Sequence, residues 1–504
     1  MRKMLSGRNG KQKELELVKR FADFGFQIHP EAIELLAHYD GNGKSTWHFN
    51  LDAIAESVSR SLDPSICVIS PEQIADFIKE KGARDDEKEK KVVKQQTHEE
   101  APTILKSFPE HGKAADHKDF LPHFIDRYER ISGILKKRVK CGQIRFIKNG
   151  MGSEDISVVG MVSSMNKTAK GNIRVELEDP TGSLSVIVPH QEEIISDEVI
   201  GVTGFLANEG YFIANKVIHP DVPISSSTSQ LSLSSSEQEK QRKRSVYAVF
   251  ISDLHVGSNT FLEEAWDSFV QWLKEKAKRI NIAYLVVAGD IADGIGIYPG
   301  QEDDLLITDI EEQYKVAAGY FHDLPSHIHV VVAPGNHDAV RGAEPQPPLP
   351  ENLRKLFPDT TCFVSNPAYI RIGGRQVLIY HGQSYDDLVN SVSRLSYSKP
   401  EDVMIEMLRR RHLAPIYGNT VSIVPNEHDY GVIDPVPDIL HCGHTHTVGI
   451  AKYRNVLLIN SGTWQSQTPY QKKRDITPVA GCATVVELCT TKVKVMDFGK
   501  RAGA

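Results

Sequence analysis

The second half of the chain alternates short apolar runs with longer segments whose apolar residues recur at helical spacing. The short runs are apolar on both faces, as expected for strands of a sheet that is covered on both sides. We therefore predict strands at residues 246–252, 283–288, 328–333, 376–380, 438–441, 456–460, 483–488 and 492–498. Strands that alternate with helices predict an α/β layered domain over residues 246–504.

Two helices are predicted between the first three of these strands. The first has one apolar face, formed by Leu262, Trp266, Phe269 and Leu273. The second would begin near Thr308, because Thr308 and Glu311 have the spacing of a capping box.

Residues 117–222 change from one period to another. A helical pattern over residues 117–139 is followed by five runs in which apolar residues alternate with polar ones, at residues 158–165, 172–179, 184–188, 199–205 and 211–217. Five short strands in about 70 residues are typical of a small OB-type β-barrel. Because the strands offer only Phe205, Tyr211 and Phe212 for base stacking, we favour a structural or interface role slightly over binding of single-stranded nucleic acid.

The remaining segments read as a small domain and two linkers. Residues 1–82 have the apolar spacing of a small helical domain, with an interaction role favoured over DNA contact. Residues 83–116 contain a run of charges and are expected to be a linker. Residues 223–245 are rich in serine, end in a basic cluster and predict a flexible tether.

Composition limits the class of protein. The length of 504 residues predicts two or three domains. No apolar run approaches the roughly 20 residues of a membrane span, and six scattered cysteines form no Cys-x-x-Cys pair, so we expect a cytoplasmic protein. The net charge of −7 is unusual for a protein that grips nucleic acid by itself. A polynucleotide substrate would need a local basic patch or a partner.

Five polar motifs follow the predicted strands. They are Asp253-Leu254-His255, Gly289-Asp290-Ile291-Ala292-Asp293, Gly335-Asn336-His337-Asp338, His381 and Gly443-His444-Thr445-His446. The carboxyl ends of strands are where ligands gather in α/β sheets. Each motif alone is weak, but carboxylate, imidazole and amide oxygen together favour a site for two divalent metal ions over a structural polar cluster.

The spacing within the motifs also suggests a geometry. Asp253 and His255 are two residues apart, so an extended backbone would aim both side chains the same way, and we expect the same of His444 and His446. Asp290 follows a glycine that would let the strand turn sharply, and its two oxygens could bridge two cations.

These motifs resemble those of the calcineurin-like metallophosphoesterase superfamily. Wider segments resemble the small subunit of archaeal family D DNA polymerases, namely SDLHVGS at 252–258, DGIGIYPGQ at 293–301, RHLAPIYG at 411–418 and SGTWQSQTP at 461–469. The resemblance extends from about residue 118 to the C-terminus. It implies a four-layer α/β metallophosphoesterase domain preceded by an OB-type barrel and a small helical N-terminal domain.

The resemblance also implies roles for individual residues. One metal ion would be held by Asp253, His255, Asp290 and His446. The second would be held by Asp290, Asn336, His381 and His444. His337 would protonate the leaving oxygen, and Asp293 would orient it. This ligand set suits manganese, with iron or zinc as alternatives.

One position departs from the phosphoprotein phosphatases, which carry an arginine where this chain has Gly294. Arg410, Arg411 or His412 could contact phosphate in its place, or could face a partner protein. His441 is expected in the core or behind the metal ligands, and Cys442 is expected to be a buried thiol.

The resemblance implies a proofreading subunit, a two-metal 3′→5′ exonuclease that acts on single-stranded or mismatched DNA ends. Its partner would be a large polymerase subunit, and a sliding clamp is a further candidate partner. A scaffold subunit without activity is one alternative, which the complete ligand set disfavours. A free-standing metallophosphoesterase is another, which the barrel and Gly294 disfavour.

Overall fold

The computed structural model describes residues 18–19, 27–33, 68–69, 71, 100–109, 116–149, 156–224, 245–473 and 476–499. The chain divides into two compact units, Met1–His98 and Glu99–Ala504. In the first unit, β1 (Gln27–Ile28) and β2 (Val68–Ile69) form a short parallel pair. Most of the helical domain expected over residues 1–82 lies outside the described residues. Within the described ranges, no helix is both long and apolar enough to cross a membrane.

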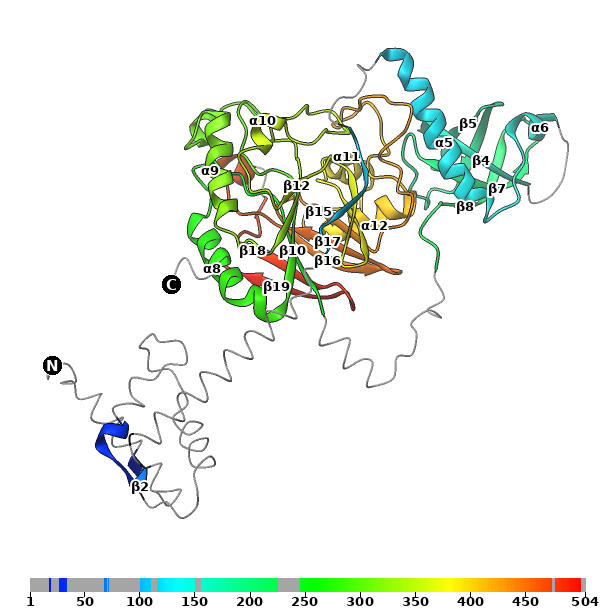
Figure 1. Ribbon diagram of the computed structural model, residues 1–504. Helices are drawn as coiled ribbons and strands as arrows, with labels where there is room; N and C mark the ends of the chain where they lie inside the picture. The colour runs from blue at the N-terminus through cyan, green and yellow to red at the C-terminus, as the bar shows by residue number, and fades with distance from the viewer. Residues whose placement is uncertain are drawn as a thin grey trace. The chain divides into compact units, whose positions relative to one another are not determined.

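Two six-stranded sheets form the centre of the second unit (Figure 1). The first sheet has the order β12-β11-β10-β9-β18-β19, with bounds Thr361–Phe363, His329–Ala333, Ile282–Ala288, Tyr247–Ile251, Cys482–Glu487 and Lys492–Asp497. The second sheet has the order β16-β17-β15-β14-β13-β3, with bounds Val448–Tyr453, Val456–Ser461, Ile439–Cys442, Arg375–Ile379, Ala368–Ile372 and Thr103–Ser107.

The alternation of side chains along the strands produces four layers. Ile251 of β9 packs with the residues of helices α8 (Glu263–Ile280) and α9 (Ile310–His322), whereas the preceding Phe250 packs against the second sheet. In the second sheet, Ile439 faces the first sheet and Leu440 faces helices α11 (Tyr385–Ser391) and α12 (Pro400–Arg410). Helices therefore cover the outer face of each sheet, and an apolar core lies between the sheets.

The helices begin largely where their sequences predict. Trp266, Phe269 and Leu273 of α8 are buried, as their spacing indicates. The N-cap of α9 is Asp309, one residue after the expected Thr308, and its side chain accepts the hydrogen bond from the Glu312 N–H. Two short helices, α10 (Glu351–Arg354) and α13 (Pro469–Lys473), complete this part of the chain.

Four of the strands described in the second unit were not anticipated from the sequence. Strands β12, β13 and β16 extend the sheets at or near their edges, where strands are short or partly exposed. The fourth, β3, lies within the segment 83–116 that we expected to be a linker, and pairs antiparallel with β13. Ser107 of β3 also bonds the hydroxyl of Ser365, and the neighbouring Phe108 is buried against Tyr430.

The strands predicted at period two form a closed barrel in the order β4-β5-β6-β8-β7. Their bounds are Ile156–Lys167, Ile173–Asp179, Gly182–Val188, Phe212–Ile218 and Val199–Leu206. A 3-10 turn (His117–Asp119) leads into helix α5 (Phe120–Lys136), which packs on β4 and β7, and helix α6 (Ile144–Asn149) packs on β6. The helix and the five strands match the sequence pattern, whereas α6 was not predicted.

Buried charges join α5 and the barrel to the α/β domain. Asp429, from a loop of the α/β domain, accepts hydrogen bonds from Arg127 at 2.6 Å and from His412 at 2.9 Å. Burial would raise the pKa of Asp429, yet His412 and Arg127 hold it well below its usual range. Arg410 pairs with Glu198 of the barrel at 3.2 Å and with Glu406. Removing one partner of such a buried pair leaves the other charge uncompensated.

We propose that the boundary of the N-terminal unit lies before β3, near residue 98. Deletion of residues 1–98 should leave the melting temperature of the remainder within about 2 °C. Deletion of residues 1–115 should cost at least about 3 kcal/mol, because it removes the buried Phe108 ring as well as β3. Calorimetry on both truncated proteins would measure this difference.

Phe108→Ala in the full-length chain is the matched control, and it should reproduce most of the loss without shortening the protein. Equal stability of the two truncated proteins would show that β3 contributes little to the sheet.

Candidate metal centre

The motif residues gather at the carboxyl ends of strands from both sheets. Strands β9, β10 and β11 are parallel neighbours in the first sheet, and β14 and β15 are parallel neighbours in the second. Asp253, Asp290 and Asn336 follow the first three strands within three residues, and His381 and His444 follow the other two within two residues. The centre is therefore built from five loops at one edge of the two-sheet core.

The first group of donors surrounds one point. Nε2 of His446 lies 3.5 Å from Oδ1 of Asp253 and 3.0 Å from Nε2 of His255. Nε2 of His255 lies 3.8 Å from Oδ2 of Asp290. Donors that share a cation at about 2.1 Å lie about 3–3.5 Å apart, so these atoms are nearly spaced for one ion.

The second group shares Asp290 with the first. Nε2 of His381 lies 3.2 Å from Oδ2 of Asp290 and 2.9 Å from Oδ1 of Asn336. The same oxygen of Asn336 lies 3.0 Å from Nδ1 of His444. A single carboxylate oxygen therefore faces histidines of both groups, which is the placement that a bridging ligand requires.

Hydrogen bonds at the far side of two imidazoles orient them for metal binding. Nδ1 of His381 donates to the carbonyl oxygen of Ala288 at 2.8 Å, and Nδ1 of His255 donates to the carboxylate of Asp293 at 2.8 Å. With Nδ1 engaged in this way, Nε2 is the ring atom that each imidazole would offer to a metal ion. The donor set of carboxylate, imidazole and amide oxygen fits divalent transition metals.

Electrostatics keeps the buried carboxylates of the centre charged. Asp253 and Asp290 are almost completely inaccessible to solvent. Burial alone would raise the pKa of each, but His446 lowers the pKa of Asp253, and His381 and His337 hold that of Asp290 well below its usual range. Ionised carboxylates are the form that binds metal ions.

The backbone of the ligand residues differs from the expected extended geometry. Five of the seven have positive φ angles, a left-handed conformation that is rare outside glycine: Asp253, His255, Asp290, His444 and His446. The expectation that extended backbone aims the paired side chains was therefore wrong. Each pair lies in a tight loop after its strand, and its residues have left-handed backbone.

Two glycines allow the loops to approach closely. Gly289 has a φ of 89°, and a Cβ there would lie 2.5 Å from Nδ1 of His381, which confirms the sharp turn expected before Asp290. A Cβ at Gly335 would overlap Oδ1 of Asp290 and would lie 2.7 Å from a ring carbon of His381. Any side chain at these positions would displace a predicted ligand.

His337 lies beside both groups of donors. Its backbone N–H donates to Oδ1 of Asp290 at 2.9 Å, and its ring Nδ1 donates to the carbonyl oxygen of Asp293 at 2.7 Å. The Asp293 carboxylate is 3.9 Å away and bonds His255 instead. Asp293 therefore contacts His337 through its main chain, whereas the sequence suggested its carboxylate.

Several residues that brace the ligands were not singled out from the sequence. The Asp338 carboxylate accepts hydrogen bonds from the N–H groups of Ile291, Ala292 and Gly335 and from the Tyr314 hydroxyl. Asp338 belongs to the third motif, so its position was a usable signal.

The side-chain amides of Gln465 and Gln471 also brace the centre. The first contacts the Asp293 carboxylate at 3.3 Å, and the second lies 2.7 Å from Nδ1 of His446. Gln465 lies within the segment 461–469 that carries the family resemblance, and Gln471 lies just after it, but neither has ligand spacing that pointed to this contact.

The residues proposed to replace the missing phosphatase arginine do not reach the centre. All three side chains are buried: Arg410 pairs with Glu198 of the barrel, Arg411 donates to the Ile433 carbonyl oxygen, and His412 bonds Asp429. His441 lies in the core against Phe250 and bonds Ser461, and Cys442 is a buried thiol as expected.

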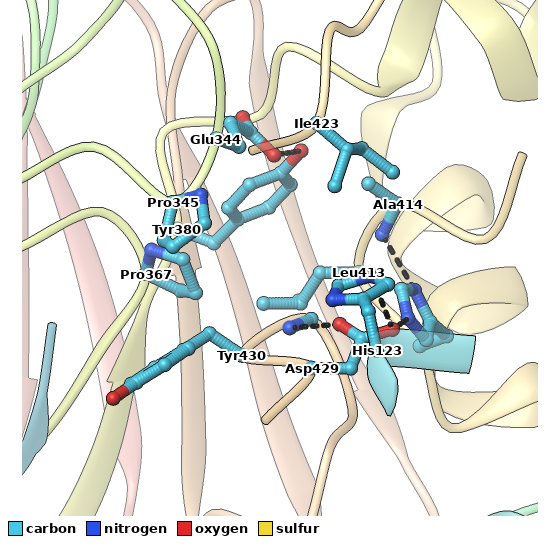
Figure 2. A pocket seen from close by; sticks show the side chains of 12 residues that line it. His123, Glu344, Pro345, Pro367, Tyr380, Leu413, Ala414, Ile423, Asp429 and Tyr430 are labelled. Carbon is cyan, nitrogen blue, oxygen red and sulfur yellow. Dashed lines mark hydrogen bonds and ion pairs between the residues drawn. The ribbon is translucent and has the colours of Figure 1, made fainter. Parts of the chain in front are cut away.

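A small cavity of about 20 Å³ is lined by Tyr380, the residue before His381 (Figure 2). Tyr380, which precedes His381, directs its hydroxyl to Glu344 at 3.1 Å. Burial raises the pKa of Glu344 to about 8, because the pocket offers little solvation to a charged carboxylate. Asp429 and His123, which belong to the contact between α5 and the α/β domain, also line this cavity.

Comparison with known proteins reveals extended similarity. Residues 248–448 match a family described as the B subunits of DNA polymerases alpha and epsilon. The DNA polymerase II small subunit of Archaeoglobus fulgidus is 44% identical over 395 residues, which cover 76% of this chain and 78% of that protein. The corresponding protein of Methanothermobacter thermautotrophicus is 42% identical over 399 residues, covering 75% and 79%.

Among solved structures, one described as a novel archaeal phosphodiesterase is 11% identical, with a TM-score of 0.26, and covers 50% of this chain and 99% of that chain.

The close approach at Gly335 generates a test of the centre. Gly335→Ala should displace the Asp290 carboxylate and weaken Mn²⁺ binding roughly 10- to 100-fold, the usual cost of disturbing the surroundings of a ligand. Isothermal titration calorimetry with the metal alone would measure the change.

Gly342→Ala is the matched control, because a Cβ there would meet nothing within 4 Å. It should bind Mn²⁺ like the natural protein. Equal affinities in both variants would show that Asp290 is not a ligand.

Proposed function

We propose that this chain is the proofreading 3′→5′ exonuclease of a family D DNA polymerase. The premise is that the chain belongs to the family of DNA polymerase II small subunits. The observation that carries the proposal is the convergence of the seven predicted ligands around Asp290. A subunit that served only as a scaffold would not need these donors to meet.

The reaction would be hydrolysis of the last phosphodiester bond at a 3′ end. Two divalent cations, for which manganese suits the donors, would supply an activated water and neutralise the phosphate oxygens. The attacking water forms a bond to phosphorus, and the bond to the 3′ oxygen of the preceding nucleotide breaks. The products are a nucleoside 5′-monophosphate and a strand with a new 3′ hydroxyl.

His337 would give a proton to the departing 3′ oxygen. Its Nδ1–H is fixed on the carbonyl oxygen of Asp293, so Nε2 is the atom that remains for this transfer. The Asp293 carboxylate, bonded to His255, would act on a metal ligand instead.

The large polymerase subunit would be the partner. The net charge of −7 gives the chain a weak basis for holding a polyanion. A proofreading exonuclease must also receive its substrate from a polymerase site. The barrel and the α/β domain, joined by the Arg410–Glu198 pair, would present one continuous surface to that partner.

The role of His337 can be separated from metal binding. His337→Ala should retain Mn²⁺ but lower the turnover of end-labelled single-stranded or mismatched DNA by roughly 10²–10⁴-fold. Chelator should abolish the activity of the natural protein. His322→Ala is the control. It removes the last residue of α9, whose ring bonds the carbonyl oxygen of Leu356, and this variant should have full activity. Full activity in His337→Ala would rule out its role as the acid.

Partnership can be tested on the purified proteins. Coexpressed with its large subunit, the chain should elute as one complex of defined mass by size exclusion with light scattering. Alone, it should bind DNA weakly at physiological salt. A monodisperse chain that ignores the large subunit and binds DNA tightly would contradict the proposal.

A further inference from the structure

Two exposed isoleucines lie in the loop that follows Asp293. Ile295 is 48% exposed and Ile297 is 39% exposed, although both are large apolar side chains. They lie two and four residues after Asp293, which is buried and bonds His255. Exposed apolar side chains are common singly, but a pair beside a polar site is a candidate contact surface.

The loop that carries the pair is held firmly in place. The buried Gln313 side chain accepts from the N–H of Gly294 at 2.9 Å and donates to its carbonyl oxygen at 3.1 Å. The buried Gln301 side chain accepts from the N–H of Ile297 at 2.9 Å and donates to the carbonyl oxygen of Asp293 at 2.9 Å. Two buried amides therefore fix the loop at both ends, so the exposure of the isoleucines is a fixed feature of the surface.

The same loop touches the residue proposed as general acid. A Cβ at Gly294 would overlap the carbonyl oxygen of His337 and would lie 3.1 Å from Cδ1 of Ile297. Ile297 and the His337 backbone therefore both lie close to Gly294. Gly294 has a φ of 75°, which brings the chain past His337 without a side chain in between.

We propose that Ile295 and Ile297 form an apolar ledge that receives the base of the terminal nucleotide while its phosphate lies at the metal centre. The inference rests on the proposed exonuclease function. A DNA end offers two chemistries near the scissile bond, a charged backbone and a flat apolar base. The metal ligands suit the first, and the ledge, which has no charge or hydrogen-bond donor in its side chains, suits only the second.

The ledge would make the site prefer unpaired DNA ends without distinguishing the four bases. Apolar contact with a base face is similar for all four bases, so discrimination among them is small. A base that is stacked within a duplex cannot lie on the ledge until it leaves its neighbour. Unpaired and mismatched ends lose less stacking and pairing energy in this step and would be removed faster.

The test compares two ends that differ only in the base. Single-stranded DNA with a normal 3′-terminal nucleotide should be hydrolysed by the full-length chain with Mn²⁺ roughly tenfold more efficiently than the same strand with a tetrahydrofuran abasic end, mainly through KM. Ile295→Ser/Ile297→Ser should hydrolyse both strands equally. Its affinity for Mn²⁺ should stay unchanged, because neither isoleucine is among the predicted ligands, and the natural protein should also hydrolyse the small diester bis-p-nitrophenyl phosphate.

Two further variants keep the test decisive. Val495→Ser on β19 removes an apolar side chain with the same 39% exposure far along the chain, and should retain the preference for a base. Ile295→Ser alone leaves Ile297 against Gly294 and should lower the preference about threefold.

The ledge is overturned if the natural protein does not distinguish the two ends, or if the double variant still does. Hydrolysis of the small diester without hydrolysis of any DNA would overturn the exonuclease function itself, and the ledge with it.

Discussion

The position of one carboxylate, that of Asp290, constrains the whole centre. Its Oδ2 must face a histidine from each group of donors, so loops from two sheets have to meet within a few ångströms. The backbone of these loops therefore packs directly against ligand side chains, and the residues at the closest approaches are glycines 289, 335 and 443. The apolar core between the sheets fixes the strand ends from which these loops start. The geometry of the predicted ligands therefore depends on the packing between the two sheets.

The parts of the fold that the sequence predicted are those with a strong period. The alternating barrel strands and the doubly apolar strands of the α/β domain were found within a few residues of their observed ends. Strands β12 and β16 escaped because short, partly exposed strands bury too little to leave a regular pattern. Strand β3 was not predicted because its partner, β13, lies more than 250 residues away in sequence. The local sequence therefore carries no sign of the pairing.

The candidate site shows the same division. The motifs indicated which residues would meet, and the family that they suggested is confirmed by sequence similarity over three quarters of the chain. The backbone hand of the ligand loops and the bond from His255 to Asp293 could not be read from spacing, because both depend on contacts between separate loops. Arg410 was misjudged for a related reason, since its partner Glu198 belongs to the barrel.

The left-handed ligand residues impose a second requirement on their positions. An L-residue in this conformation costs about 1 kcal/mol or more, and Asn, Asp and His tolerate it better than most side chains. Aspartate and histidine at positions 253, 255, 290, 444 and 446 thus satisfy chemistry and conformation together. A relative without the proposed metal chemistry would still need the same backbone bends to keep these loops. Its choices there would be confined to glycine and small polar residues, and β-branched residues would be excluded, so vanished activity would leave a recognisable trace in the sequence.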